Sequence, residues 1–314
     1  PANTVIMSFK LSLGKVAITE KEMYSNEAIM AFIDKGVEKI SPEYLYYLLR
    51  AKDWSKGTNK AVMGATLNKA TLSTIKIQLH EYDNQLEIVN MLNRVSSSID
   101  FRKQQLTKLD ELIKARFVEM FGNAETTSQA QTKRLEECCI SISGGNTPSM
   151  QHPEYYGGKI PFIKSGDVKS DHISVSSLTL TQIALNETTV KMLPKGTLIV
   201  VIRSAALLKE FRIGILDVDA VINQDLKALQ TSDDVLPVYL MWAIKMKSQV
   251  LLSRVQTMLT SHIRMEDLLD LKVQIPHLSL QNQFANFVAE INKSKLLAEV
   301  FAQSTCILAE NRSK

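Results

Sequence analysis

The second half of this chain repeats, in the same order, a series of motifs found in its first half, and this repeat limits the folds that the chain can adopt. The matched pairs share residue types and order: Pro1–Ser8 with Pro194–Val201, Ser25–Glu27 with Ile222–Gln224, Pro42–Leu45 with Pro237–Leu240, Leu72–Leu79 with Leu268–Ile275, and Gln85 with Gln281. A repeat of this length is far longer than the roughly 20–50 residues of a solenoid unit. The sequence therefore predicts two copies of one module.

The two copies differ at their starts. The stretch from Arg134 to Leu193 precedes the second copy and has no counterpart before Pro1. We therefore expect a whole second module and a first module that begins partway through.

The composition is that of an ordinary globular protein. The chain has 314 residues, of which 45% are hydrophobic and 22% charged, so it is long enough for two domains and unlike a disordered chain. A net charge of +4 permits a nucleic-acid partner without proving one. The three cysteines (Cys138, Cys139 and Cys306) form no CxxC pair, which is typical of a reducing cytoplasm. No apolar run could span a bilayer and no signal segment is present, so we expect a cytoplasmic protein.

Apolar residues between Gln85 and Phe121 recur at spacings of three, four or seven, which predicts a long amphipathic helix. Gly122 supplies a stop for this helix, and a weaker version of the pattern covers residues 281–311. Two interpretations are open: the two helices pair antiparallel along their apolar seams, which we favour, or each helix packs on its own domain. The predicted seam residues are Ile88, Leu92, Val95, Ile99, Leu106, Leu109, Ile113, Phe284 and Ile291.

Each module has a mixed pattern of strands and short helices. Runs rich in β-branched residues predict strands at Thr197–Ile202 and Ile75–Leu79. Short helices are expected at Pro42–Lys52 and Pro237–Lys247, whereas Ile140–Val168 is rich in turn residues and is expected to be mainly loop.

The sequence lacks the familiar catalytic and cofactor motifs. It contains no GxxxxGK[ST], HExxH, GxSxG or GxGxxG, and its five histidines are scattered. We therefore expect a non-catalytic protein without a metal or cofactor. The Gly144-Gly145-Asn146 turn could cradle a phosphate, although tight turns of this composition are common.

Three polar clusters are candidates for a binding surface. Lys164, Ser165 and Asp167 follow an apolar run and combine the donors and acceptors that base edges need, or else they form an ordinary hairpin turn. Arg203-Ser204, with Lys209 and Arg212, could contact phosphate oxygens or form a solvated charged face.

The third cluster differs between the two copies. It contains Ser261, His262 and Arg264, and its counterpart in the first copy is Gly64–Asn68. Different polar residues at the same place on one fold suit two modules that recognise different targets. Neutral sequence drift of a surface loop would produce a similar difference. In the first copy, the candidate contacts are Lys56, Lys60 and Asn68.

Several of these segments together resemble one family. Ser143–Pro148 and Tyr155–Val168 are similar to the opening of a target recognition domain of the specificity (S) subunit of type I restriction–modification enzymes. Ile99–Ile113, followed by Arg116–Gly122, resembles the central conserved helix of that subunit, and Pro1–Ile18 resembles the later half of a recognition domain.

The resemblance implies an α+β fold with two mixed α/β target recognition domains separated by two long antiparallel coiled-coil helices. The implied parts are the C-terminal half of a first recognition domain (1–83), a central spacer helix (84–122), a linker (123–133), a second recognition domain (134–279) and a second spacer helix (280–314). By the family pattern, a further segment would precede Pro1. A natural truncation, a phase-variable product and an expressed fragment stay open as origins.

The resemblance also implies a function. The chain would recognise a bipartite duplex DNA target without performing chemistry, and the helices would fix the gap between half-sites. They would also dock methyltransferase (M) subunits, which an endonuclease/translocase (R) subunit joins. The DNA contacts that we expect are Lys164, Ser165, Asp167, Arg203, Ser261, His262 and Arg264 in the second module, and Lys56, Lys60 and Asn68 in the first. The alternative is a scaffold that reads no DNA and binds methyltransferase through its helices; self-association also stays open.

Overall fold

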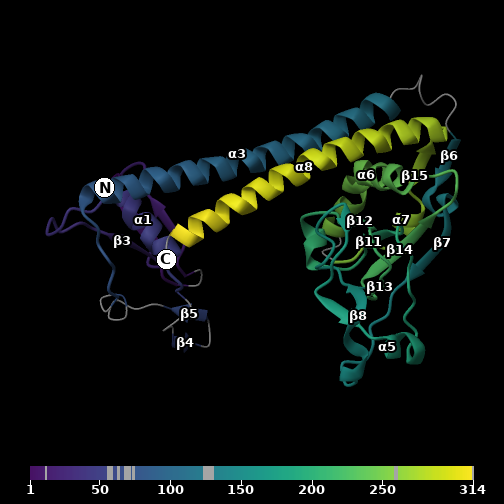
Figure 1. The fold of residues 1–314 in the computed structure, drawn as a ribbon, viewed down its shortest axis with the longest axis horizontal. Coiled ribbons are helices and arrows are strands. Elements are labelled where there is room, and N and C mark those ends of the chain that lie inside the picture. The colour runs from purple at the N-terminus through teal and green to yellow at the C-terminus, as the bar shows by residue number, and fades with distance from the viewer. Residues whose placement is uncertain are drawn as a thin grey trace. The chain divides into compact units, whose positions relative to one another are not determined.

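The computed structural model describes residues 1–10, 13–54, 59–61, 64–66, 72, 75–122, 131–257 and 261–312 (Figure 1). For residues 59–61, 64–66, 256–257 and 299–312 this description covers the backbone alone. The chain divides into two compact units. The first contains Pro1–Gln105 and Ala298–Lys314, and the second contains Leu106–Leu297.

The first unit is built on a three-stranded antiparallel sheet in the order β2-β1-β3. Its elements are β1 (Val5–Ser8), β2 (Val16–Ile18), β3 (Ile29–Phe32), helix α1 (Pro42–Ala51), the hairpin β4 (Asn59–Ala61) and β5 (Gly64–Thr66), and the first part of α3 (Tyr82–Phe121). Val5 and Met7 point into a small core with Leu49 and Trp54.

The second unit contains a five-stranded sheet in the order β7-β14-β11-β12-β9 and two smaller sheets, β10-β8-β13 and β15-β6. Its strands are β6 (Gln131–Arg134), β7 (Cys139–Gly144), β8 (Tyr156–Ile163), β9 (His172–Ile173), β10 (Leu178–Leu180), β11 (Leu198–Val201), β12 (Ile213–Leu216), β13 (Val221–Ile222), β14 (Leu226–Thr231) and β15 (Lys272–Ile275). Its helices are α5 (Gln182–Glu187), α6 (Pro237–Thr257), α7 (Met265–Leu269), the first part of α8 (Leu278–Arg312), and the 3₁₀ turns η1 (Leu135–Cys138), η2 (Pro153–Tyr155) and η3 (Ala205–Leu208).

The core of the second unit lies on both faces of β11, whose four residues are all buried. A continuous run of aliphatic residues suits such a strand, because both of its faces are covered. Leu198 and Val200 pack in one cluster with Trp242 of α6, whereas Ile199 and Val201 pack in a second cluster.

Equivalent residues of the sequence repeat pair in the same way in the sheets of the two units. In the first unit β1 pairs with β3 through Val5 and Phe32, and in the second unit β11 pairs with β14 through Leu198 and Leu229. The second neighbour of the central strand follows the same rule, as Val5 pairs with Ile18 and Leu198 with Ile215.

The turns at the start of the two central strands also match. Asn3 and Gly196 both have positive φ, of 59° and 89°, and each donates a backbone hydrogen bond to the carbonyl of an equivalent residue, Thr19 or Leu216. The predicted two copies of one module are therefore confirmed for the part of the module that both halves contain.

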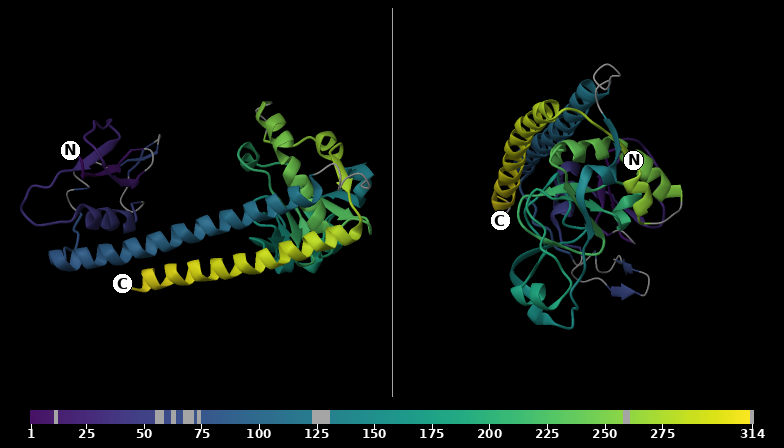
Figure 2. Two further views of the ribbon diagram at one scale, coloured as in Figure 1. Left: turned by 90° about the horizontal axis from the view of Figure 1, so that it is seen from above. Right: turned by 90° about the vertical axis from the view of Figure 1, so that its right-hand side faces the viewer.

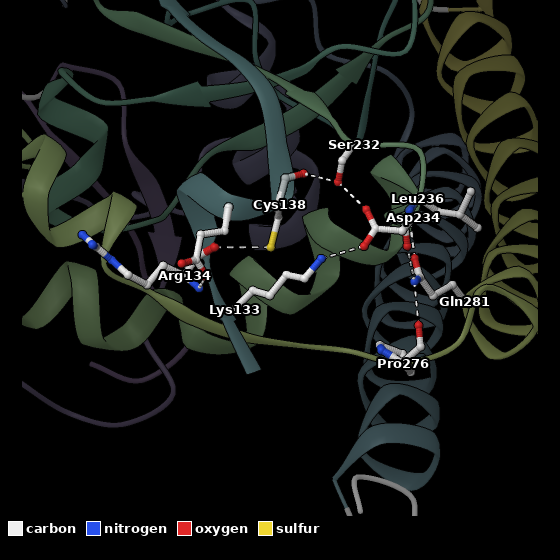
Figure 3. A network of polar contacts seen from close by, with 9 residues as sticks. Lys133, Arg134, Cys138, Ser232, Asp234, Leu236, Pro276 and Gln281 are labelled. Atoms are coloured by element: carbon white, nitrogen blue, oxygen red, sulfur yellow. Dashed lines mark hydrogen bonds and ion pairs between the residues drawn. The ribbon is translucent and has the colours of Figure 1, made fainter. Parts of the chain in front are cut away.

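A buried glutamine forms the same three hydrogen bonds in each module. In the second unit the Gln281 side-chain oxygen accepts from the Leu236 N–H (2.8 Å), and its amide nitrogen donates to the carbonyls of Asp234 (2.9 Å) and Pro276 (2.8 Å) (Figure 3). We call this arrangement the glutamine clasp. It joins the start of α6, the residue after β15 and the first turn of α8.

The first unit contains the equivalent clasp. The Gln85 oxygen accepts from the Ser41 N–H (2.9 Å), and its nitrogen donates to the carbonyls of Lys39 (3.1 Å) and His80 (2.8 Å). Because both glutamines are fully buried, their amides compensate for backbone groups that would otherwise be desolvated without partners.

The two long helices pair within the second unit, where they lie side by side (Figure 2). Phe117 of α3 makes an edge-to-face contact with Phe284 of α8 (5.3 Å between ring centroids), and Asp110 forms an ion pair with Lys295. A residue later in α3 thus meets one earlier in α8, so the helices run antiparallel here. The same phenylalanines also contact Tyr239 and Trp242 of α6, so this stretch packs on the domain as well as on its partner helix.

All nine predicted seam residues are buried or partly buried. Ile113 and Phe284 are fully buried, Ile291 packs against the same core, and the remaining six are partly buried. The stop at Gly122 is confirmed, because α3 ends at Phe121. Most of the predicted linker, residues 123–130, lies outside the described residues.

Two predictions of local structure are wrong. Ile75–Leu79 forms no strand, although its counterpart Lys272–Ile275 forms β15. Lys272–Ile275 becomes a strand because it pairs with β6, which begins in the linker before the second module. Within Ile140–Val168, expected to be mainly loop, the chain forms most of β7 and all of β8. Pairing with β14 and β13 overrides the weak strand propensity of glycine and serine there.

No helix in the described parts of the chain combines the length and the apolar character needed to cross a membrane.

Candidate nucleic-acid interface

Two of the three predicted polar clusters come together in the second unit. Arg203 and His262 form an isolated antiparallel bridge, the Ser204 N–H donates to the Ser261 carbonyl (2.9 Å), and the Ile263 N–H donates to the Ile202 carbonyl (2.7 Å). Segments about 60 residues apart in the chain thus lie beside each other, which the sequence alone did not predict.

A carboxylate on α7 holds two arginines of this region. Asp267, which is largely buried, accepts from the Arg264 Nε (3.1 Å) and from Arg254 near the end of α6. Both guanidinium groups stay about half exposed, and they line a small hollow with His262. We call Arg203, Arg254, His262, Arg264 and Asp267 the arginine cluster.

The Lys164 turn is closed by its own aspartate. The Asp167 carboxylate accepts from the Lys164 N–H (2.9 Å) and from the Ser177 N–H (3.1 Å) and hydroxyl (3.3 Å). Lys164 and Ser165 are partly buried. The carboxylate therefore orders the turn and keeps Lys164 in a fixed position.

The turn Asn223–Asp225 connects the Lys164 turn to the arginine cluster. The Asn223 N–H donates to the Ile163 carbonyl (3.0 Å), immediately before Lys164. On the other side, the Asp225 carbonyl accepts from the Arg203 N–H (3.2 Å), and its carboxylate lies 3.9 Å from the Arg203 guanidinium. These contacts link three polar groups, the Lys164 turn, Asn223–Asp225 and the arginine cluster, which we together call the recognition edge.

Close packing of two backbone segments explains the glycine at position 145. A Cβ on Gly145 would lie 2.1 Å from the Ile222 carbonyl oxygen, so only glycine allows the backbones to approach this closely. The Asn146 amide donates to the Thr189 hydroxyl (3.0 Å). Packing thus accounts for this turn without a bound phosphate.

Not every basic residue of the second predicted cluster lies on this surface. Arg212 forms an ion pair with Glu210, and both line a separate cavity of about 150 Å³ together with Asp171 and Lys245. Lys209 is the C-cap residue of η3.

The candidate residues of the first module fall largely outside the description. Lys56 and Asn68 lie outside the described residues, and Lys60 lies in β4, where the side chain is not described.

The second unit shows no activated thiol. Burial raises the pKa of Cys138 to about 11 and that of Cys139 to about 12, so both are protonated at neutral pH. Among the described residues, no three His, Cys, Asp or Glu side chains are grouped so as to hold a metal ion.

Sequence reasoning missed Arg254, Asp267 and the Asn223–Asp225 turn as parts of this surface. Asn223 belongs to the sequence repeat, but residue types alone do not indicate that it joins two polar clusters. Arg254 lies in the part of α6 that extends beyond the predicted helix end at Lys247.

The fold and this surface define a protein with a mixed α/β module and paired long helices. The family model described as "Type I restriction modification DNA specificity domain" matches residues 1–111 and 127–300. Since the match covers most of the sequence, the chain belongs to this family.

Individual relatives agree. The MjaIX specificity subunit of Methanocaldococcus jannaschii is 27% identical over 235 residues, covering 68% of this chain and 53% of the relative. The EcoR124I/EcoR124II specificity subunit of Escherichia coli is 25% identical over 148 residues, covering 46% of this chain and 37% of the relative. This chain thus matches about half or less of the length of these curated relatives.

A solved structure shares the fold. The type I restriction–modification S subunit from M. genitalium aligns with 99% of this chain and 81% of its own length, with a TM-score of 0.56 at 13% sequence identity.

Proposed function

We propose that this chain is a DNA-reading specificity subunit of a type I restriction–modification complex. The observation that carries the proposal is the recognition edge, where exposed arginines and a histidine from distant segments meet beside an ordered lysine turn. Membership in the specificity family and the names of the relatives support the same conclusion.

The residue types of the recognition edge suit duplex DNA. Arginine can donate two hydrogen bonds to a guanine edge or to phosphate oxygens, and serine and histidine can contact either. We assign DNA contacts in the second module to Lys164, Ser165, Arg203, Ser261, His262 and Arg264, with Asp167 holding the Lys164 turn. In the first module we assign them to Lys56, Lys60 and Asn68.

The paired helices suit a scaffolding role. We propose domain boundaries at 1–83, 84–122, 123–133, 134–279 and 280–314, with the two helical parts acting as spacers that dock methyltransferase subunits. An endonuclease/translocase subunit would join that complex in the cytoplasm. The chemistry is assigned to these partners, because the sequence carries none of the catalytic motifs sought.

Charge reversal at the recognition edge tests the DNA-reading role. We expect Arg264→Glu to weaken binding to a duplex selected by the wild-type chain about a hundredfold, since a base or phosphate contact becomes a repulsion. The slope of log affinity against log salt should also become shallower by about one unit. Electrophoretic titration at several salt concentrations, with methyltransferase subunits present, measures both quantities.

The matched control is Lys272→Glu, which reverses an exposed charge on β15, outside both the recognition edge and the long helices. It should leave the affinity within about twofold, because only charges near the duplex contribute strongly. Equal effects of the two reversals would remove Arg264 from the interface.

A second substitution tests whether Asp267 positions the arginines or acts only through its negative charge. Removing a negative charge near DNA should tighten binding, yet Asp267 holds Arg254 and Arg264 in place. We therefore expect Asp267→Asn to weaken binding to the selected duplex about tenfold, while binding to a scrambled duplex stays equal or tightens. Asp270→Asn is the control, because Asp270 pairs with Arg134 instead. Tighter binding of Asp267→Asn to both duplexes would show that Asp267 acts only as a charge.

A further inference from the structure

Gln224 is exposed at the tip of a turn whose backbone is fixed on both sides. The preceding residue, Asn223, is buried, and its backbone N–H donates to the Ile163 carbonyl (3.0 Å). The Asn223 side chain closes the turn, because its oxygen accepts from the Asp225 N–H (3.3 Å) and its nitrogen donates to the Asp225 carboxylate (3.0 Å). The Leu226 N–H also donates to the Asn223 carbonyl (3.2 Å). The turn therefore holds the Gln224 backbone in one place on the surface.

A second segment holds the Gln224 side chain. The Thr147 hydroxyl, from the loop after β7, donates a hydrogen bond to the side-chain oxygen of Gln224. This bond uses one lone pair of the oxygen, so the second lone pair and the two amide N–H groups can still pair with a ligand. A side chain that is ordered before binding loses less conformational entropy when it binds. The Gln224 amide therefore suits a planar partner that offers both a donor and an acceptor.

The turn connects the two cationic parts of the recognition edge. Asn223 contacts the end of β8 immediately before the Lys164 turn, and the Asp225 carbonyl accepts from the Arg203 N–H (3.2 Å). Lysine and arginine contacts to phosphates position a protein on a duplex but carry no sequence information, which comes from contacts to base edges. The neutral amide of Gln224, between two segments that carry cations, suits a base edge.

The first module contains the same turn with a different residue at its tip. The Asn26 side-chain oxygen accepts from the Ala28 N–H (3.0 Å), and the Asn26 carbonyl accepts from the Ile29 N–H (3.2 Å). These bonds match those that close the Gln224 turn. The tip residue here is Glu27, which is also exposed. An ionised glutamate only accepts hydrogen bonds, whereas glutamine donates and accepts. Two modules that share one fold therefore present different hydrogen-bonding groups at the same place.

We propose that Gln224 reads one adenine of the half-site bound by the second module. Its amide donates to adenine N7 and accepts from the N6 amino group, which is the pairing that glutamine makes in the major groove. Thr147 is a positioning residue, because it holds the amide and does not itself contact the base. The inference rests on the proposed DNA-reading function and adds to it the side chain that selects one base pair. A glutamate at this place would instead accept from the N4 amino group of cytosine.

Selection of duplexes from a random-sequence library, with the full chain and methyltransferase subunits, tests this assignment. The wild-type chain should prefer adenine at one position of the half-site by at least about tenfold. Gln224→Glu should change that preference to cytosine and leave the other positions unchanged. Gln224→Ala should remove the preference at that position alone, and Thr147→Val should weaken it there.

The matched control is Gln182→Glu, because Gln182 is an exposed glutamine on α5, outside the recognition edge. It should select the wild-type sequence. If Gln224→Glu also selected the wild-type base at every position, the assignment would be overturned and the DNA-reading function would stand. A uniform loss of affinity for all duplexes, without a change of base, would place Gln224 on a phosphate and overturn the assignment too. Unbiased sequences from the wild-type chain would contradict the DNA-reading function and the assignment together.

Discussion

Replacing Gln281 with leucine should lower the free energy of unfolding of the second unit by about 3 kcal/mol. Leucine fills nearly the same space, but it leaves the Leu236 N–H and the carbonyls of Asp234 and Pro276 without their partner. Gln281 is fully buried, so water does not replace the lost bonds. Urea unfolding followed by the fluorescence of Trp242, in a Trp54→Phe background, reports on this unit alone.

Two further variants make the result specific to the clasp. Gln283→Leu alters an exposed glutamine on the same helix and should change the stability by less than about 0.5 kcal/mol. Gln85→Leu should destabilise the first unit, which Trp54 reports in a Trp242→Phe background. If Gln281→Leu unfolded at the wild-type urea concentration, the clasp would not stabilise the module.

Shortening Phe284 to alanine should cost still more, about 3–5 kcal/mol. This fully buried ring meets Phe117 and Phe121 of α3 and Trp242 of α6 at centroid distances of 5.3, 5.6 and 6.5 Å. The cavity would therefore open where the two helices and the domain meet. Urea unfolding measures the loss, and near-ultraviolet circular dichroism reports whether the aromatic cluster keeps its packing.

The control for this variant is Phe101→Ala, because Phe101 is exposed on α3. It should be nearly neutral, since little apolar area returns to water. Comparable losses for both phenylalanines would mean that the helices are held mainly by something other than this core.

The features of the fold that could be predicted from the sequence are those that depend on the spacing of apolar residues and on the repeat. The spacing of apolar residues located α3, Gly122 indicated its end, and the repeat predicted two copies of one module, which the matching strand pairs of β1 and β11 bear out. These features depend on residue type and spacing within one segment, so they can be predicted without knowing which other segment packs against it.

The failures concern segments whose conformation depends on a distant partner. Ile75–Leu79 has the composition of a strand but pairs with no strand among the described residues, whereas the glycine- and serine-rich β7 becomes a strand beside β14. In the same way, Arg203 and His262 were separate candidates in the sequence, and only the fold brings them together. Asp267 could not be identified as part of the site from the sequence, because its role depends on its ion pairs with two arginines.

Selection of duplexes from a random-sequence library tests the central claim most directly. The full chain is mixed with methyltransferase subunits, bound duplexes are recovered and sequenced, and the affinity for the winner is compared with that for a scrambled duplex. DNA reading by the recognition edge predicts enrichment of a defined half-site and an affinity ratio of at least about 10³. Recovery of unbiased sequences, with an affinity ratio near one, would contradict it.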